Sequence, residues 1–297
     1  MNFAKQLRAE AKGFRLKDHD PAGQGSLDRA HAERLQEKHL GRLLELQDRF
    51  YAHHRESILM ILQGMDAAGK DGLIKHVMSG INPAGCEVYS FKAPSTIELD
   101  HDYLWRTHVH TPERGRLGIF NRSYYEEVLV VRVHPEFLAN EKLPVGAEGD
   151  GKIWKKRYED INVFERYLVR NGTHVVKFFL HLSKREQARR FLARIDDPAK
   201  NWKFSKADLA ERGHWDAYQV AFQEMIRHTS TDAAPWYIIP ADHKWFARTA
   251  VSAILAEVLR KIDPQYPTVT EAHRRELLEI RKQLAPHVGA KAAAKAK

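Results

Sequence analysis

The sequence predicts an α/β fold in which helices cover both faces of a parallel sheet, and three observations support this. Short apolar runs alternate with amphipathic stretches of helical length along most of the chain. The first apolar run, Ile58–Leu62, contains no polar residue, as in a strand buried on both faces of a sheet. A Gly-rich loop joins this run to a helical stretch. Strands that alternate with crossover helices are typical of βαβ units, so we expect one sheet of parallel strands.

The predicted elements follow the chain in order. Residues 1–25 are polar and interrupted by Pro and Gly, so we expect an extended N-terminal arm. Residues 26–51 carry a rough apolar stripe behind Ser26, which can act as an N-cap, and predict a packing helix. After the first strand at 57–63, continuous apolar runs predict strands at 86–92, 116–120, 173–182 and 236–239. Amphipathic stretches predict helices at 70–79, 99–110, 123–131, 153–170, 184–194, 215–229, 247–262 and 270–284.

The composition is that of an ordinary globular protein, and it excludes several classes. The 297 residues are 43% hydrophobic and 29% charged, which is enough apolar material for a sizeable core. Cys86 is the single cysteine, which excludes an intramolecular disulfide and a cysteine-based zinc site. No apolar run has the length of a membrane span, and the first residues lack the apolar stretch of a secretory signal. We therefore expect a cytoplasmic protein with no membrane contact. We also expect residues 26–285 to form one domain and the Lys/Ala-rich residues 286–297 to be disordered.

The loop between the first strand and its helix has the spacing of a phosphate-binding P-loop, with Gly64 followed by the pair Gly69 and Lys70. Glycines let the backbone N–H groups turn inward around an anion, and the helix N-terminus adds a partial positive charge. The other interpretation is a Gly-rich turn that binds nothing, which the buried strand before it and the lysine after it argue against. The predicted phosphate-binding residues of the loop are Gly64, Ala67, Ala68, Gly69, Lys70, Asp71 and Gly72.

Two acidic residues make this loop unusual. Asp71 stands where Ser or Thr normally follows the lysine and holds Mg²⁺. Asp66 lies inside the loop, where a carboxylate would repel phosphates unless a divalent cation lay between them. We therefore predict that the loop supplies its own metal ligand.

A second set of candidate residues follows the strand at 116–120. Ligands gather at the carboxyl edge of such sheets, so the end of this strand should lie near the loop. P-loop enzymes often place an Asp here to support Mg²⁺, but this chain has Asn121. Arg122 could clamp a phosphate through two N–H groups, although a lone Arg more often forms a surface ion pair. Glu126, about one helical turn further on, could carry the missing negative charge. The predicted metal ligands are Asp66, Asn121 and Glu126.

A third segment, at about 184–210, is strongly basic and predicts a helical lid. Between residues 184 and 206 there are eight basic and three acidic residues. A helix–loop–helix here could close over bound phosphates and exclude water, which competes as a phosphoryl acceptor. The alternative is a solvated basic face. The predicted phosphate contacts are Arg189, Arg190, Arg194 and Lys200. The excess of 48 Lys and Arg over 39 Asp and Glu, a formal charge of +9, also favours a polyanionic partner.

These three segments together resemble the polyphosphate kinase 2 family. The matching stretches are Gly64–Gly72, with the sequence GMDAAGKDG, Phe120–Leu129, FNRSYYEEVL, and Phe191–Ser205, FLARIDDPAKNWKFS. The second stretch has Asn121 where many relatives have Asp, and in this form it resembles the class III branch of the family. That branch is associated with phosphorylation of both AMP and ADP. The resemblance implies a P-loop kinase fold with a lid and catalytic roles for Asp66, Lys70 and Arg122. It also implies a phosphate contact for Arg132, and a role for Glu126 in compensating for Asn121.

The predicted activity is Mg²⁺-dependent, reversible, in-line phosphoryl transfer from inorganic polyphosphate to AMP and ADP. The resemblance implies purine nucleoside mono- and diphosphates in general as acceptors, GMP and GDP included, with Mn²⁺ as an alternative ion and a homodimer or homotetramer as the assembly. One alternative is an ATP-dependent nucleoside monophosphate kinase of similar fold, which Asp71 and the charge of the lid argue against. A second alternative is a basic nucleic-acid-binding protein. We expect no nucleic-acid partner, because the sequence contains no nucleic-acid-binding module.

Overall fold

The computed structural model describes residues 2–144 and 152–288. The chain divides into two compact units, Met1–Pro264 and Gln265–Lys297. The first unit contains the sheet and all the candidate site residues. In the second unit, helix α12, Glu271–Leu284, begins after Thr270, whose hydroxyl accepts a hydrogen bond from the His273 N–H at 3.2 Å. Within the described ranges, no helix is both long and apolar enough to cross a membrane.

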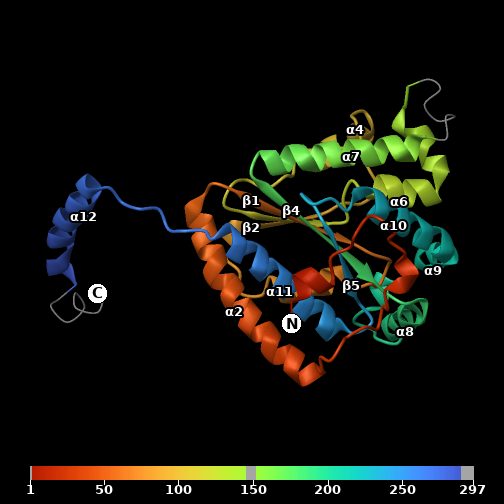
Figure 1. The fold of residues 1–297 in the computed structure, drawn as a ribbon, viewed down its shortest axis with the longest axis horizontal. Coiled ribbons are helices and arrows are strands. Elements are labelled where there is room, and N and C mark those ends of the chain that lie inside the picture. Colours follow the sequence, from red (N-terminus) through yellow and green to blue (C-terminus); the bar gives the residue numbers. More distant parts are fainter. Residues whose placement is uncertain (1, 145–151, 289–297) are drawn as a thin grey trace. The chain divides into compact units, whose positions relative to one another are not determined.

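A single sheet of five parallel strands forms the centre of the first unit (Figure 1). The strands lie in the order β2-β3-β1-β4-β5. The register aligns Leu62 of β1 with Asn121 of β3 and with Phe178 of β4, so the carboxyl ends of the central strands meet at one edge. The five predicted strands are confirmed, with ends that differ by up to two residues. Their bounds are Ser57–Gln63 for β1, Cys86–Ser90 for β2, Leu117–Asn121 for β3, Thr173–His181 for β4 and Trp236–Pro240 for β5.

Helices cover both faces of this sheet, as the sequence predicts. Alternate residues of β1 point to opposite faces: Met60 belongs to one apolar core and Ile61 to the other. The first core packs against α1, Phe3–Gln6, α2, Arg29–His53, α3, Lys70–Val77, and α11, Lys244–Ile262. The second packs against α6, Glu126–Val133, α7, Ile153–Arg170, and α10, Trp215–Thr229 (Figure 1). Shorter elements connect these layers: α4 at Thr96–Leu99, α5 at Trp105–His108, α8 at Lys184–Ile195, α9 at Lys206–Gly213, and 3₁₀ turns at Leu16–Asp18, Pro83–Gly85, Pro135–Glu141, Asn201–Lys203 and Ala285–His287.

The N-terminal segment, predicted as an extended arm, packs against the sheet. Phe3, Phe14 and Leu16 are buried, and residues 7–9 lie antiparallel to β5. The Ala9 N–H donates to the Trp236 carbonyl at 2.8 Å. A strand at the edge of a sheet exposes unpaired backbone groups, and this segment covers those of β5. The apolar residues of this segment follow neither a helical nor a strand periodicity, so the sequence pattern did not indicate this packing. The compact unit therefore includes the N-terminal segment, which was not predicted.

Three other predictions need correction. The predicted helix at 99–110 is two short helices, α4 and α5, because the Asp102 carboxylate accepts from the Leu104 N–H at 3.0 Å and forms a turn between them. The N-cap of α2 is Asp28, which accepts from the His31 N–H at 2.7 Å, and not Ser26. The compact unit ends at Pro264 rather than at residue 285. Of the predicted tail at 286–297, residues 289–297 lie outside the described residues, and Pro286 and His287 belong to a 3₁₀ turn.

Candidate active site

The Gly-rich loop after β1 is held in place by the neighbouring strand β4. A Cβ on Gly64 would lie 2.9 Å from the Leu180 carbonyl oxygen, so only glycine allows this approach. Gly69 has a φ of 105° and forms the N-cap of α3. Ala67 also has a positive φ, 63°, which is strained for a residue with a side chain. The loop therefore delivers the N-terminus of α3 to the carboxyl edge of the sheet, where an anion would meet its free N–H groups.

Lys70 is buried beneath this loop. Its ammonium donates to the carbonyl of Gly64 at 2.6 Å and to that of Met65 at 3.4 Å. Burial lowers the Lys70 pKa, and the nearby Arg122 guanidinium lowers it further, while Asp66, Glu126 and Asp71 oppose the shift. A phosphate bound beside the loop would give the Lys70 ammonium a negatively charged partner in place of neutral carbonyls. This partner would favour the protonated form of Lys70 over the neutral form.

Three predicted site residues from two separate segments lie together next to the loop. The Arg122 guanidinium contacts the Asp66 carboxylate at 2.9 Å and the Glu126 carboxylate at 3.6 Å. The Glu126 and Asp66 charges raise the Arg122 pKa, against desolvation. Burial raises the Glu126 pKa, while Arg122 and Lys70 lower it. Arg122 has a φ of 66°, so the turn that presents it is strained.

Two compartments meet at Asp66 and Arg122. A cleft of about 830 Å³ lies on the side of α3, α8 and α11. A small cavity of about 120 Å³ lies on the side of α6 and α10, and its walls include Glu126, Leu129 and Phe222. Asp66 and Arg122 line both spaces. Groups bound in the two spaces would therefore meet at one carboxylate and one guanidinium.

The charges of the cleft have one predominant sign. Ten Lys and Arg side chains line it, against three Asp side chains. Its walls follow the carboxyl ends of all five strands, from Ser90 at the end of β2 to Ala241 after β5. The cationic residues are Lys70, Lys92, Arg122, Arg189, Arg190, Arg194, Lys200, Lys203, Lys244 and Arg248.

The oxygen donors near the loop fit a hard divalent cation. The Asp66 and Glu126 carboxylates both lie against Arg122, at the meeting point of the two compartments. Mg²⁺ commonly takes one or two carboxylates and completes its shell with water and phosphate oxygens. Within residues 2–144 and 152–288, no three His, Cys, Asp or Glu side chains form a complete ligand cage, so phosphate oxygens would have to contribute. The Asn121 amide N–H₂ donates to Asp71 at 2.7 Å, which leaves only its carbonyl oxygen for a metal.

The predicted lid forms a helix–loop–helix beside the cleft, consisting of α8, a 3₁₀ turn and α9. Arg189, Arg194 and Lys200, three of the predicted phosphate contacts, line the cleft. Arg189 is held by Glu186 through two hydrogen bonds of 2.6 Å, and Lys200 pairs with Asp197. Arg194 lies over the Phe191 ring, 5.8 Å from its centroid.

Two predicted phosphate contacts are placed differently. All five N–H groups of Arg190 are used: one donates to Glu186, two to the carbonyls of Ala67 and Ala68, and two to the carbonyls of Ala241 and Asp242. Arg190 therefore fastens the loop to the end of β5 and has no donor left for a phosphate. Arg132 lines neither compartment, because it faces α7 and donates to the Tyr158 hydroxyl at 2.7 Å. Spacing along a basic helix could not separate the arginine that turns inward from those that face the cleft.

Sequence reasoning also missed contributors to the site. The buried Gln187 donates to the Asp66 carbonyl at 3.0 Å and accepts from Arg212 at 2.7 Å, so it connects α8 and α9 to the loop. Lys244 and Arg248 line the cleft from α11. The rule used for the strand at 116–120, that ligand residues follow strand ends, would have found Lys244 if it had been applied to β5.

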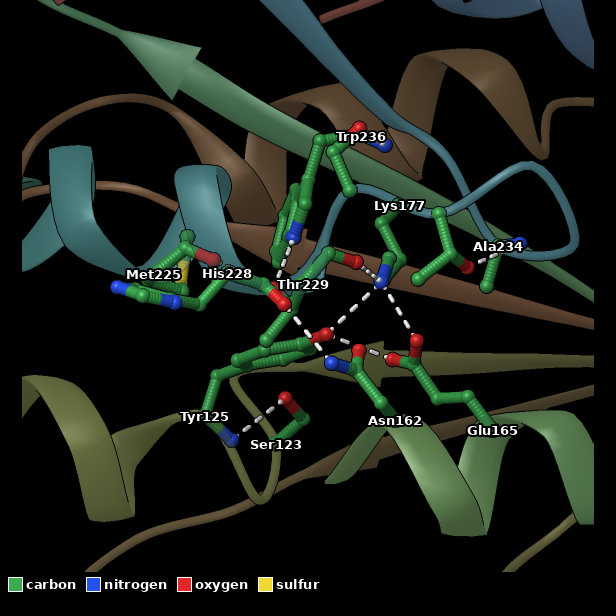
Figure 2. A network of polar contacts seen from close by, with 12 residues as sticks. Ser123, Tyr125, Asn162, Glu165, Lys177, Met225, His228, Thr229, Ala234 and Trp236 are labelled. Atoms are coloured by element: carbon green, nitrogen blue, oxygen red, sulfur yellow. Dashed lines mark hydrogen bonds and ion pairs between the residues drawn. The ribbon is translucent and has the colours of Figure 1, made fainter. Parts of the chain in front are cut away.

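A buried ionic network supports the turn that carries Arg122 (Figure 2). The Lys177 ammonium on β4 donates to Glu165 at 2.6 Å, to the Tyr125 hydroxyl at 2.8 Å and to the Thr229 carbonyl at 2.7 Å. The hydroxyls of Tyr124 and Tyr125 donate to the same Glu165 oxygen, at 2.8 and 2.7 Å. Because the tyrosines directly follow Arg122 and Ser123, the network fixes the far end of the strained turn.

Comparison with known proteins gives a consistent result. The model of the family described as polyphosphate kinase 2 (PPK2) matches residues 26–267. The chain is 55% identical over 254 residues to an ADP-polyphosphate phosphotransferase of Rhodopseudomonas palustris, covering 86% of this chain and 88% of that protein. It is 43% identical over 278 residues to an AMP/ADP-polyphosphate phosphotransferase of Meiothermus ruber, covering 93% of this chain and 100% of that protein.

The crystal structure of polyphosphate kinase 2 from Arthrobacter aurescens TC1 matches with a TM-score of 0.85 and 38% identity, covering 94% of this chain and 97% of that one. The match confirms the predicted P-loop kinase fold. On the family model and on these relatives, the chain belongs to the polyphosphate kinase 2 family.

Proposed function

We propose that this enzyme transfers phosphoryl groups from inorganic polyphosphate to AMP and ADP, reversibly and with Mg²⁺. One observation carries the proposal: a long cationic cleft and a small acidic cavity share Asp66 and Arg122. The names of relatives from Rhodopseudomonas palustris and Meiothermus ruber give the same donor class and the same acceptors.

The donor fits the cleft and not the cavity. A chain of phosphates needs many cations along its length, and ten Lys and Arg side chains line the cleft. Five strands spaced about 4.8 Å apart make this edge about 19 Å wide. A single nucleotide would leave most of these cations without a counter-charge, so the cleft favours polyphosphate over ATP as the donor.

The acceptor fits the cavity on the other side of Asp66. Its phosphate end would lie beside Arg122, and the apolar side chains of Leu129, Val130 and Phe222 offer contacts to the nucleoside. Asp66, Glu126 and Glu211 make this wall acidic, which suits a phosphate accompanied by a divalent cation. GMP and GDP belong to the same acceptor class.

Catalysis then consists of positioning and charge neutralisation, since phosphoryl transfer needs little covalent help from a protein. The N–H groups at the start of α3 and the Lys70 ammonium hold donor phosphates, and Arg122 neutralises the charge on the moving group. Asp66 and Glu126 would hold Mg²⁺, with Mn²⁺ as the alternative ion and the Asn121 carbonyl oxygen as a further ligand. When bound, the ion would supply positive charge that offsets the negative charge of the reacting phosphates. Closure of α8 and α9 would exclude water.

The test is a direct assay without ATP. Purified protein is incubated with long-chain polyphosphate, Mg²⁺ and each of AMP, ADP, GMP and GDP, and nucleotide products are separated by chromatography. We expect ADP and ATP from AMP, and ATP from ADP. Product from ATP plus AMP but none from polyphosphate would instead establish an ATP-dependent kinase. RNA retention on filters that resists both salt and competing polyphosphate would favour a nucleic-acid-binding protein.

The assembly is tested separately. The family resemblance predicts a homodimer or homotetramer, and the mass measured by light scattering during size-exclusion chromatography distinguishes these from a 34.3 kDa monomer.

A further inference from the structure

The cationic cleft continues beyond the loop to the start of α11. Lys244 and Arg248 lie one helical turn apart on α11 and line the same cleft as Lys70. Arg190 lies between the two regions, with one end on the carbonyls of Ala67 and Ala68 and the other on those of Ala241 and Asp242. Since β5 is two strands from β1, the axes of these two strands lie about 10 Å apart.

These two cations differ from Arg189, Arg190 and Lys200, which line the same cleft and have acidic partners. Glu186 pairs with Arg189 and Arg190, and Asp197 pairs with Lys200. The Lys244 ammonium and the Arg248 guanidinium make no hydrogen bond or ion pair with any residue in the described part of the chain. The Lys244 side chain is exposed to solvent, and Arg248 is partly buried.

The neighbouring charges make this arrangement unfavourable unless an anion is bound. Desolvation lowers the pKa of Lys244, and the positive charges of Arg190, Arg248 and Arg189 lower it further, with only Glu186 opposing them. Desolvation and then the charge of Arg29 lower the Arg248 pKa. A bound polyanion would reverse the repulsion among these cations.

We propose that Lys244 and Arg248 bind the part of the polyphosphate chain that lies beyond the reacting end, and that they set the preference of the enzyme for long chains over short ones. This inference rests on the proposed function. A short donor such as tripolyphosphate would reach the loop and Lys70 without reaching α11. A long chain would contact both, and each added contact would strengthen its binding.

The experiment compares two donors with three variants. Lys244→Gln, Arg248→Gln and the double variant are assayed with AMP, Mg²⁺ and either tripolyphosphate or long-chain polyphosphate. The control is Lys261→Gln, because Lys261 lies on the same helix near its other end and is 4.0 Å from Glu257. The dissociation constant of each donor is measured by calorimetry at several salt concentrations, so that binding is known even for a donor that reacts slowly.

We expect the double variant to bind long-chain polyphosphate about tenfold to a hundredfold more weakly, with kcat unchanged. The dissociation constant of tripolyphosphate should change less than twofold. The slope of log K against log salt for the long chain should fall by about one for each cation removed. Lys261→Gln should match the wild type throughout.

Four results would overturn the inference. Unchanged binding of the long chain by the double variant would show that α11 does not contact it. Equal weakening for both donors would show a general field effect or damage to the loop, as would a fall in kcat. If the wild type bound and used neither donor, the proposed function itself would fail, and this inference with it. Thermal unfolding of each variant checks that weak binding does not come from loss of structure.

Discussion

The cleft and the buried network beside it use charged groups in opposite ways. In the network, the Lys177 ammonium has three hydrogen-bond partners, and its side chain is 0% exposed (Figure 2). In the cleft, ten cations gather around three acids, and Lys244 and Arg248 have no partner among the described residues. Both regions lie along the same sheet, and both come close to Arg122: the network includes Tyr125, three residues later in the chain, and the cleft includes Asp66, 2.9 Å from the guanidinium.

The difference separates stability from ligand binding. A buried charge must be paired, since loss of its partner leaves it desolvated without compensation. A charge that faces a cleft can remain unpaired until a ligand binds, because solvent in the cleft hydrates it and the folded protein loses little stability. Substitutions in the network should therefore affect mainly stability, and substitutions in the cleft should affect mainly function.

Asp66→Asn should give the largest effect on activity and is the sharpest test of the cleft. We expect transfer from polyphosphate to AMP to fall at least about a thousandfold, because the amide cannot hold a divalent cation as the carboxylate does. The melting temperature should stay within about 2 °C, since the Asp66–Arg122 pair is partly exposed. Asp232→Asn, which breaks another exposed pair with Arg8, is the control. Full activity of Asp66→Asn would remove Asp66 from the metal site.

Lys177→Met should give the largest effect on stability. It leaves the Glu165 carboxylate buried without its cation, so the free energy of unfolding should fall by about 3–5 kcal/mol in urea denaturation. Adding Glu165→Gln should recover part of this loss, because a neutral amide oxygen still accepts from both tyrosines. If the double variant were less stable than Lys177→Met, the buried charge would not be the cause.

The sequence was sufficient to predict the sheet, the loop and the grouping of Asp66, Arg122 and Glu126. These depend on local patterns and on one rule, that ligand residues follow the carboxyl ends of strands. It was not sufficient for the orientation of single side chains. Arg190 and Arg194 are four residues apart on one basic helix, yet Arg190 is 5% exposed and binds backbone carbonyls, while Arg194 faces the cleft.

The buried network was also missed, for a related reason. Lys177 stands in an apolar strand, and nothing local shows that Glu165, twelve residues earlier, lies opposite it. Residues that pair through tertiary contacts, such as these, become visible only when the fold brings their segments together.

His181 offers a third case, a buried ionisable group at the end of β4 that forms no ion pair with any described residue. Burial lowers its pKa to about 4, against the opposing charges of Asp242 and Asp20, and it is 7% exposed. Its pKa in the unfolded chain is about 6.5, so below that pH the unfolded state binds a proton that the folded state does not.

The contribution of His181 is therefore fully present above pH 6.5 and is lost as the pH falls toward 4. About 2 kcal/mol should disappear between pH 7 and pH 5. Urea denaturation at both pH values, compared with His181→Gln, measures this contribution. The variant should lose correspondingly less stability on acidification, whereas His31→Gln, with its ring exposed on α2, should follow the wild type. An identical pH dependence for His181→Gln and the wild type would contradict the assignment.

Tyr125→Phe should give the smallest effect, and it tests whether the two regions are connected. It removes one acceptor from Lys177 and one donor to Glu165, while Lys177 keeps Glu165 and the Thr229 carbonyl. Unfolding should become easier by about 1 kcal/mol. Because Tyr125 closes the turn that begins at the strained Arg122, kcat should also fall severalfold while the KM for polyphosphate stays constant.

The matched control is Tyr124→Phe, which removes a hydrogen bond to the same Glu165 oxygen but leaves all the partners of Lys177 in place. A loss of stability in both variants with kcat unchanged in Tyr125→Phe would show that the network only supports the fold. A lower kcat in Tyr125→Phe alone would show that Lys177, through Tyr125, sets the position of Arg122. The buried network would then contribute to catalysis as well as to stability. A rigid Arg122 guanidinium at the meeting point of the two compartments neutralises the moving phosphoryl group better than a mobile one.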